Sequence, residues 1–220
     1  MRTITLNNLL NNEGKGFPVT QGISGGKIYT ANSPLPPGDS CTSCLWVVPN
    51  ENVEEVTRLS SPSGSLVPNH IYYFSMKVYF PGNANGSFDF YWPVQEPSAL
   101  SNLSTNVSKS WVKLSGTFNR NSFTEGNYQC RIDYNNRQST LGVNISAIML
   151  VDLTQSFGPG LEPTKEWCDS HLVWNDPTIS ILVYENMNEF LTDIADAIRN
   201  KSGSHSLLFA SDFPQLIQAL

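Results

Sequence analysis

Cysteines are the residues of this chain whose spacing most resembles a chemical site. Cys41 and Cys44 have the Cys-X-X-Cys spacing of a metal-ligand pair, and four thiolates would complete a tetrahedral zinc site. A strong zinc pattern contains two such pairs, whereas Cys130 and Cys168 are single and far apart. Cys130 is in phase with the apolar positions of an expected strand, which indicates core packing. We therefore interpret the cysteines as buried thiols, with a disulfide as the second interpretation and zinc as the third.

The remaining residue types that could act in catalysis form no recognisable arrangement. His70, His171 and His205 have no nucleophile motif beside them and no metal-ligand spacing. The glycine-rich segment 22–26 lacks the lysine and the following helix of a phosphate-binding loop. Spacing in the sequence does not show whether two carboxylates lie close enough in space to act as the pair of a glycosidase. Enzymes of that class usually need a larger scaffold than this chain provides. We expect no enzymatic activity and no cofactor.

Composition excludes two further classes of function. The formal charge is −6 and lysine and arginine form no cluster, so a phosphate-neutralising surface for nucleic acid is not expected. No apolar stretch approaches the roughly 18 residues of a membrane helix, and the N-terminus does not have the pattern of a signal peptide. We expect synthesis in a cytosol and no membrane insertion. With 40% hydrophobic and 11% aromatic residues, the chain has ample material for a core.

Short strands separated by turn residues dominate the pattern between residues 26 and 152. Glycine, proline, asparagine and serine occur between them, and no helix intervenes. Such a series predicts a mostly β fold, an antiparallel β-sandwich. The expected strands are Leu45–Pro49, Val53–Leu59, His70–Phe80, Ser87–Val94, Ser110–Phe118, Asn127–Tyr134 and Val143–Val151.

The pattern changes after Val151. Leu161–His171 suits a short helix with Pro163 in its first turn, and Asn175–Tyr184 reads as a linker that ends in a short extended piece. Glu189–Asn200 and the last residues of the chain predict two helices, too short to bury their apolar faces alone. We expect a sandwich domain at 1–174 and a two-helix interaction module at 175–220. Its apolar contact residues are Phe190, Leu191, Ile194, Ile198, Leu216, Ile217 and Leu220.

Strand alternation indicates a candidate binding surface. If the outward faces of three expected strands lie side by side, they combine aromatic rings with planar polar groups. Rings stack on the CH faces of sugars, and planar polar side chains bridge neighbouring hydroxyl groups. A glycan site, a protein interface and a plain solvated surface are all consistent with this composition. The residues are Tyr73, Lys77, Asp89, Tyr91, Gln129, Arg131 and Asp133.

Three stretches resemble known proteins. Ala147–Asp169 resembles a segment of tail and minor structural proteins of phages that infect Gram-positive hosts, where it closes a jelly roll similar to carbohydrate-binding modules. Trp111-Val-Lys-Leu-Ser-Gly-Thr-Phe118 looks like a strand of the same sandwiches. Ile194–Gly203 with Phe209–Pro214 resembles a small helical module of such phage proteins. Together they cover about a third of the chain, and none is a catalytic motif.

The resemblance implies a jelly-roll fold and a position in a virion. In related carbohydrate modules, acidic side chains near the first and last strands hold a structural calcium. By this resemblance, Glu13 and Asp152 are the candidate calcium ligands here. Two carboxylates without a further ligand pattern do not predict calcium binding. We therefore make no prediction about metal binding.

We expect a non-enzymatic structural or adhesion component of a phage tail or fibre, assembled in the bacterial host. Its expected partners are other virion proteins, copies of itself and a host-surface glycan. The alternatives are a stand-alone carbohydrate-binding module, which would bind wall glycans as an isolated domain, and a subunit of a wall-degrading enzyme, which would release reducing ends.

Overall fold

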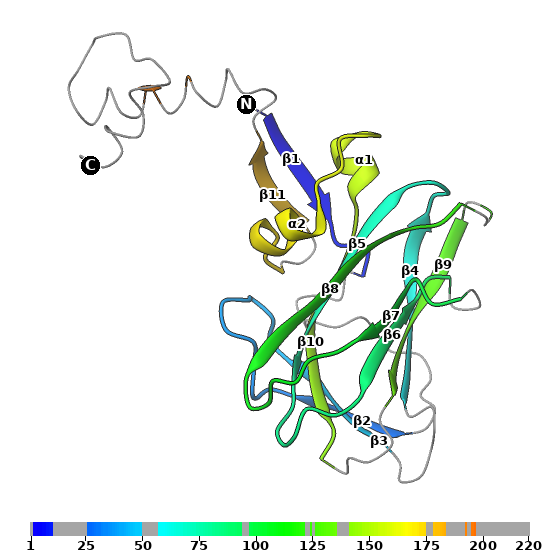
Figure 1. Ribbon diagram of the computed structural model, residues 1–220, viewed down its shortest axis with the longest axis vertical. Helices are drawn as coiled ribbons and strands as arrows, with labels where there is room; N and C mark the ends of the chain where they lie inside the picture. Colours follow the sequence, from blue (N-terminus) through cyan, green and yellow to red (C-terminus); the bar gives the residue numbers. More distant parts are fainter. Residues whose placement is uncertain are drawn as a thin grey trace. The chain divides into compact units, whose positions relative to one another are not determined.

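The computed structural model shows a chain built mostly from β-strands (Figure 1). It describes residues 2–10, 26–49, 57–93, 97–121, 124, 126–135, 141–174, 178–183, 192 and 195–196. The chain divides into two compact units, one spanning Thr5–Ile179 and the other combining Met1–Ile4 with Ser180–Leu220. Strands β1 (Arg2–Asn7) and β11 (Thr178–Val183) form a two-stranded sheet. The extended piece predicted before Tyr184 is therefore confirmed as β11.

The larger unit holds two antiparallel sheets. The five-stranded sheet has the order β2 (Gly26–Ala31), β3 (Cys44–Pro49), β10 (Val143–Asp152), β5 (Ile71–Tyr79), β8 (Trp111–Asn119). The four-stranded sheet has the order β4 (Thr57–Leu66), β9 (Gly126–Asn135), β6 (Ser87–Tyr91), β7 (Leu100–Leu103). From β3 to β6, and again from β7 to β10, successive strands alternate between the sheets. This is the strand order of a jelly roll, and it confirms the predicted fold class.

Period-two alternation places one face of each sheet in the core. On β5, the side chains of Tyr72, Phe74 and Met76 are fully buried and belong to this core. Phe74 stacks on Phe90 of β6 with ring centroids 4.0 Å apart, which joins the two sheets. Each fully buried aromatic side chain contributes roughly 1.5–3 kcal/mol of transfer free energy. Alternate residues from Tyr72 to Phe80 and from Phe88 to Trp92 all belong to this core.

Strand β10 is buried on both faces and carries a bulge. The register shifts between Ser146 and Met149, and Ala147 adopts φ 51°, in the left-handed region. The carbonyl oxygen of Ile148 accepts hydrogen bonds from Asn8 Nδ2 at 3.2 Å and from Trp174 Nε1 at 3.1 Å. These side chains replace the strand partners that the bulge removes, so buried polar backbone stays satisfied.

Two short helices follow β10. Asp152 caps α1 (Leu153–Phe157), a helix that the sequence did not predict. Thr164 caps α2 (Lys165–His171) by accepting a hydrogen bond from the amide of Trp167 at 3.3 Å. The helix predicted at Leu161–His171 is therefore shorter than expected, because Pro163 precedes the cap instead of lying in the first turn. Within the described part of the chain, no helix combines the length and the apolar character needed to cross a bilayer.

The C-terminal interaction residues cannot be compared with the structure. Phe190, Leu191, Ile194, Ile198, Leu216, Ile217 and Leu220 all lie outside the described residues. Of the helix predicted at Glu189–Asn200, the structure describes Thr192, Ala195 and Asp196, and these are helical. The domain boundary after Trp174 and the two-helix module remain predictions.

All four cysteines are buried, and none of them forms a disulfide. Cys130 belongs to the core, as its strand phase predicted. Burial raises the pKa of Cys41 and Cys44, and raises that of Cys168 to about 12. Thiols with raised pKa values are protonated and unreactive at neutral pH.

Asp152, one of the two calcium candidates, has both carboxylate oxygens engaged. Its Oδ2 lies 2.8 Å from His70 Nδ1, and its Oδ1 accepts the amide hydrogen of Gln155 at 2.8 Å. Glu13, the other candidate, lies outside the described residues.

Candidate binding surface

The predicted surface is divided between the two sheets. Tyr73 and Lys77 lie on β5 of the five-stranded sheet, whereas the other predicted residues lie on β6 and β9 of the four-stranded sheet. The assumption that these outward faces adjoin is therefore wrong, because β5 pairs with β8 and β10. The structure brings together the β6 and β9 residues, which are Asp89, Tyr91, Gln129, Arg131 and Asp133.

On the four-stranded sheet, these polar groups contact one another. Tyr91 pairs with Arg131 and Asp89 with Asp133 across β6 and β9. The guanidinium of Arg131 lies 3.6 Å from the ring centroid of Tyr91, and its Nε lies 3.1 Å from Asp133 Oδ1. The Asp133 side chain is only 3% exposed. Because the guanidinium covers the tyrosine ring, this face is a closed polar arrangement and a poor stacking platform.

Asp89 is also engaged on this face. It accepts hydrogen bonds from the amide of Asn102 at 2.8 Å and from Asn135 Nδ2 at 2.9 Å. The side chain of Gln129 lies outside the described residues. The two hydrogen bonds of Asp89 fix β7 and β9 to β6, so the role of Asp89 is structural.

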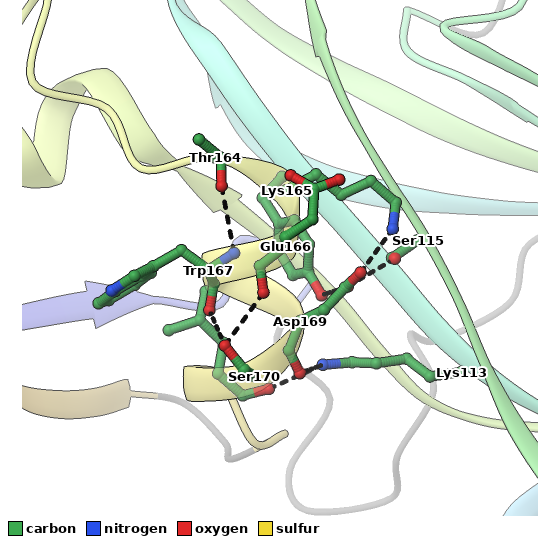
Figure 2. A network of polar contacts seen from close by, with 10 residues as sticks. Lys113, Ser115, Thr164, Lys165, Glu166, Trp167, Asp169 and Ser170 are labelled. Atoms are coloured by element: carbon green, nitrogen blue, oxygen red, sulfur yellow. Dashed lines mark hydrogen bonds and ion pairs between the residues drawn. The ribbon is translucent and has the colours of Figure 1, made fainter.

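Tyr73, from the other sheet, is buried beneath α2 instead of facing a ligand. Its hydroxyl group donates a hydrogen bond to Asp169 Oδ1 at 2.8 Å, and Ser115 donates to the same oxygen at 2.6 Å. Burial, followed by the neighbouring carboxylate, raises the pKa of Tyr73 well above its ordinary value. Asp169 also pairs with Lys165, one turn earlier in the helix (Figure 2). This network attaches α2 to the outer face of the five-stranded sheet.

Lys113 completes the attachment at the end of α2. Its Nζ donates hydrogen bonds to the carbonyl oxygens of Asp169 and Leu172, at 3.1 and 3.0 Å (Figure 2). A cation at the C-terminus of a helix compensates carbonyl groups that have no partner within the helix. The main role of this cluster is therefore to hold α2 on the sheet. Its members are Tyr73, Ser115, Lys165, Asp169 and Lys113.

An aromatic row crosses the same outer face at the other end of the strands. Strand register places Tyr29 opposite Trp46, Trp46 opposite Asn144, Asn144 opposite Tyr79, and Tyr79 opposite Trp111. Directly opposed residues point to the same face, so these five form one line from β2 to β8. Four spacings of about 4.8 Å give the row a length of about 19 Å. We call Tyr29, Trp46, Asn144, Tyr79 and Trp111 the aromatic row.

The rings of the row form two cross-strand pairs. Tyr29 and Trp46 have centroids 5.3 Å apart, and Tyr79 and Trp111 have centroids 5.7 Å apart. Tyr29 is 46% exposed and Trp46 is 39% exposed, which is unusual for large apolar side chains within a sheet. Tyr79 and Trp111 are partly exposed, whereas Asn144 between the pairs is buried.

Two indole nitrogens distinguish the row from a plain surface. Trp46 Nε1 donates a hydrogen bond to the carbonyl oxygen of Leu141 at 3.1 Å, which holds the exposed ring in one orientation. The Nε1 of Trp111 is buried and has no acceptor within the described part of the chain. An unused donor of this kind is uncommon in proteins and is satisfied when a ligand or water supplies an oxygen. The row therefore offers exposed stacking faces, whereas the free donor of Trp111 lies beneath its surface.

Sequence reasoning missed this site. Alternation placed Tyr79 on the outward side of its strand, but Tyr29, Trp46 and Trp111 were not selected. The available signal was one aromatic residue at an outward position on each of four strands. Their alignment depends on the pairing of β10 with β3 and β5, which single-strand periodicity does not contain.

No protein-family model matches the chain, and no curated protein matches it. Among solved structures it is similar to the enzymatically active domain of bacteriophage CBA120 tailspike protein 4, with 13% identity and a TM-score of 0.42, over 58% of this chain. The match spans only 18% of that tailspike chain. A second similar structure is the carbohydrate-binding module CBM6cm-2 of Cellvibrio mixtus lichenase 5A, with 17% identity and a TM-score of 0.40, covering 67% of this chain and 95% of that module.

A third similar structure is the cyclase Fisc from Fischerella sp. TAU, with 16% identity and a TM-score of 0.42, covering 68% of this chain and 83% of the cyclase. These three proteins differ in function. The jelly-roll assignment follows from the strand order of the chain itself, and the candidate site follows from the exposed rings of the aromatic row.

Proposed function

We propose that this chain is a non-enzymatic component of a bacteriophage tail or fibre that binds a host-surface glycan on the aromatic row. The observation that carries the glycan part is the alignment of four rings across one sheet face, of which Tyr29 is 46% and Trp46 39% exposed. The resemblance of residues 147–169 and 194–203 to phage structural proteins supports the virion part. We place its partners among other virion proteins and copies of itself.

The geometry of the row suits an extended sugar chain. Rings present flat apolar surfaces to the CH groups of a pyranose while polar groups at their edges meet hydroxyl groups. Trp46 is already held by its bond to Leu141, so binding orders little that was free beforehand. Covering the exposed rings also removes apolar surface from water.

Two carboxylates on the same outer face of the five-stranded sheet are paired with lysines, which favours binding over hydrolysis. Asp39 lies against Lys77, with Oδ2 and Nζ 2.6 Å apart, and Asp169 lies against Lys165. A glycosidase needs one carboxyl group that is protonated and donates to the leaving oxygen. Burial opposes ionisation of Asp169, but hydrogen bonds from Lys165, Ser115 and Tyr73 lower its pKa below the ordinary value. It is thus ionised at neutral pH and unsuited as a general acid.

The test compares Trp46→Ala and Tyr29→Ala with the wild-type chain on a panel of purified Gram-positive wall oligosaccharides, using calorimetry. Loss of one stacked ring, worth about 0.5–1.5 kcal/mol, should weaken binding by roughly two- to twelvefold. The matched control is Trp167→Ala, because Trp167 lies on α2 and packs against Phe157 and His171 outside the row. Wild-type protein that binds no member of the panel, or an equal loss in the control, would contradict the glycan proposal.

The virion part has its own experiment. Cross-linking of intact phage particles followed by mass spectrometry should recover this chain joined to other tail or fibre proteins. A chain that binds wall glycans but is absent from particles would instead be a stand-alone carbohydrate-binding module.

A further inference from the structure

A pair of lysines lies next to the aromatic row on the same face of the sheet. Lys77 of β5 is directly opposite Lys113 of β8, two residues along from the pair of Tyr79 and Trp111. Two residues of a strand span about 7 Å, so the lysines and the aromatic pair are close enough to contact the same sugar residue. They line a cavity of about 180 Å³ together with two carboxylates, Asp39 and Asp169, and with Trp174.

Like charges placed directly opposite each other destabilise a sheet unless they are compensated. Lys77 is compensated by Asp39, whose Oδ2 lies 2.6 Å from its Nζ. Lys113 is not compensated in the same way: it donates to two neutral carbonyl oxygens, at 3.1 and 3.0 Å. Within the described part of the chain, no carboxylate oxygen lies within ion-pair distance of its Nζ.

The cavity therefore contains unused hydrogen-bonding capacity of both kinds. An ammonium group has three N–H donors, and the contacts of Lys113 use two of them. On the opposite side, the Asp39 side chain is 1% exposed, and its Oδ1 has no donor among the residues that the structure describes. Lys113 and Asp39 thus both line the same small space, and Asp39 Oδ1 is buried in its wall.

Electrostatics at Lys113 agree with this geometry. Burial lowers the pKa of Lys113, which shows that its charged form lacks the solvation it would have in water. A bound anion would restore that stabilisation. Among the charged neighbours of Lys113, Asp169 has the largest effect and raises its pKa, Lys77 lowers it and Asp39 raises it, so an anion would add to a partial compensation.

We propose that the glycan bound by this chain is acidic, and that the cavity takes one acidic substituent together with a neighbouring hydroxyl group. The carboxylate or phosphate pairs with Lys113, and the hydroxyl group donates to Asp39 Oδ1. This inference rests on the proposed glycan function, because a sugar stacked on Tyr79 and Trp111 is what brings the substituent to the cavity. At about 180 Å³ the cavity is smaller than the roughly 300–1,000 Å³ of sites for whole drug-sized ligands, so it suits a substituent.

The experiment titrates the full chain with three sugars and follows amide resonances by nuclear magnetic resonance. D-glucuronate carries a carboxylate, glucose 6-phosphate carries a phosphate, and glucose is the neutral control. At least one acidic sugar should shift the amides of Lys77, Lys113 and Leu172 in a saturable way, with a Kd at least tenfold below that of glucose. The acid that binds more tightly identifies the substituent. Acetate is the control for an anion without a neighbouring hydroxyl group.

Two variants test the assigned contacts. Lys113→Gln should lower the ratio of acid affinity to glucose affinity to about one, and Lys113→Arg should keep that ratio high. If Lys113→Gln does not fold, Asp39→Asn takes its place: it removes the partner charge of Lys77 and keeps an amide oxygen for the hydroxyl group, so the ratio of acid affinity to glucose affinity should rise.

Contradictory results separate the two proposals. Acidic sugars that bind no tighter than glucose, while glucose shifts the amides of Tyr29 and Trp46, would overturn the acidic substituent and leave the glycan function standing. Acetate that matches the acidic sugars would overturn the combined recognition of acid and hydroxyl group. Failure of every sugar to bind would overturn both.

Discussion

The indole nitrogen of Trp46 lies 3.1 Å from the carbonyl oxygen of Leu141, although 95 positions separate the two residues in sequence. Gly142, the next residue, makes this approach possible. It adopts φ +69°, and a Cβ atom placed on it would lie 2.3 Å from the carbonyl oxygen of Val47. The orientation of an exposed ring on β3 thus depends on the backbone just before β10.

Gly142→Ala should release Trp46 from its fixed orientation. The added methyl group collides with backbone, and the left-handed conformation costs a further 1–2 kcal/mol or so. We expect lower stability and a shifted indole N–H resonance of Trp46. Gly160→Ala is the matched control, because Gly160 has φ +79° but nothing within 4 Å of its Cβ position. Equal effects in both variants would show that backbone strain alone is responsible.

Tyr73→Phe should destabilise the sandwich through Asp169. Hydrogen bonds to charged groups contribute about 1.5–3 kcal/mol, and this one is made by a fully buried tyrosine. In a double-mutant cycle with Asp169→Asn, measured by urea unfolding, the two changes should be clearly less than additive. Tyr79→Phe, on the same strand but outside this network, provides the comparison. Strict additivity would mean that the hydrogen bond does not couple the residues.

Acid should weaken the attachment of α2 at a pH set by Asp169. Its folded pKa is lowered, so its contribution to stability is present above the unfolded carboxyl pKa of about 4 and is lost as pH falls below that value toward the folded pKa. Asp169→Asn should remove this part of the acid dependence and leave the remainder. The measurement is the free energy of unfolding between pH 2 and 6 for both chains. Parallel curves would contradict the assignment.

Native thiols should react slowly with iodoacetamide. Cys168 has a pKa raised to about 12 and no exposed surface, so at pH 8 almost none of it is thiolate. Labelling followed by peptide mass spectrometry should modify Cys168 only when urea unfolds the chain. Rapid modification without urea would show that α2 detaches readily from the sheet.

Truncation after Trp174 should leave the sandwich folded. Every strand of the two large sheets precedes that residue, and the Trp174 indole is retained to donate to Ile148 on β10. The removed part includes β11, the partner of β1, so a modest loss of stability is expected. Circular dichroism should show a cooperative β-type melt. An aggregated or unfolded product would place the domain boundary elsewhere.

Strand positions were predictable because period-two alternation is a local property. The strand predicted at His70–Phe80 is β5, and that predicted at Val143–Val151 is β10, each within one residue at both ends. Strand β2 was not recognised, because Gly26–Ala31 has no buried side chain and lies at a sheet edge. Tyr73 was predicted correctly to lie on the outer face of its sheet. At that position, however, α2 covers the outer face and buries the tyrosine. Such burial depends on Asp169, which is 96 residues away in sequence.

The site was less predictable than the fold for the same reason. Four of the seven proposed residues do adjoin, because β6 and β9 pair Asp89 with Asp133 and Tyr91 with Arg131, yet Arg131 covers the ring of Tyr91. Whether a polar face is open or closed depends on rotamers and register. The line from Tyr29 to Trp111 needs four strand registers to be correct at once, and none of them is encoded in the spacing of a single strand.

The central place of β10 has a consequence for synthesis. The β2–β3 pair and the β5–β8 pair are joined only through β10, which is the last strand of the sandwich to be made. Chains fold from the N-terminus as they are translated, so the two halves of the five-stranded sheet stay separate until residues 143–152 have left the ribosome. A nascent or prematurely terminated chain that lacks β10 therefore carries the four rings of the row without their alignment. Only a finished sandwich presents them as one line.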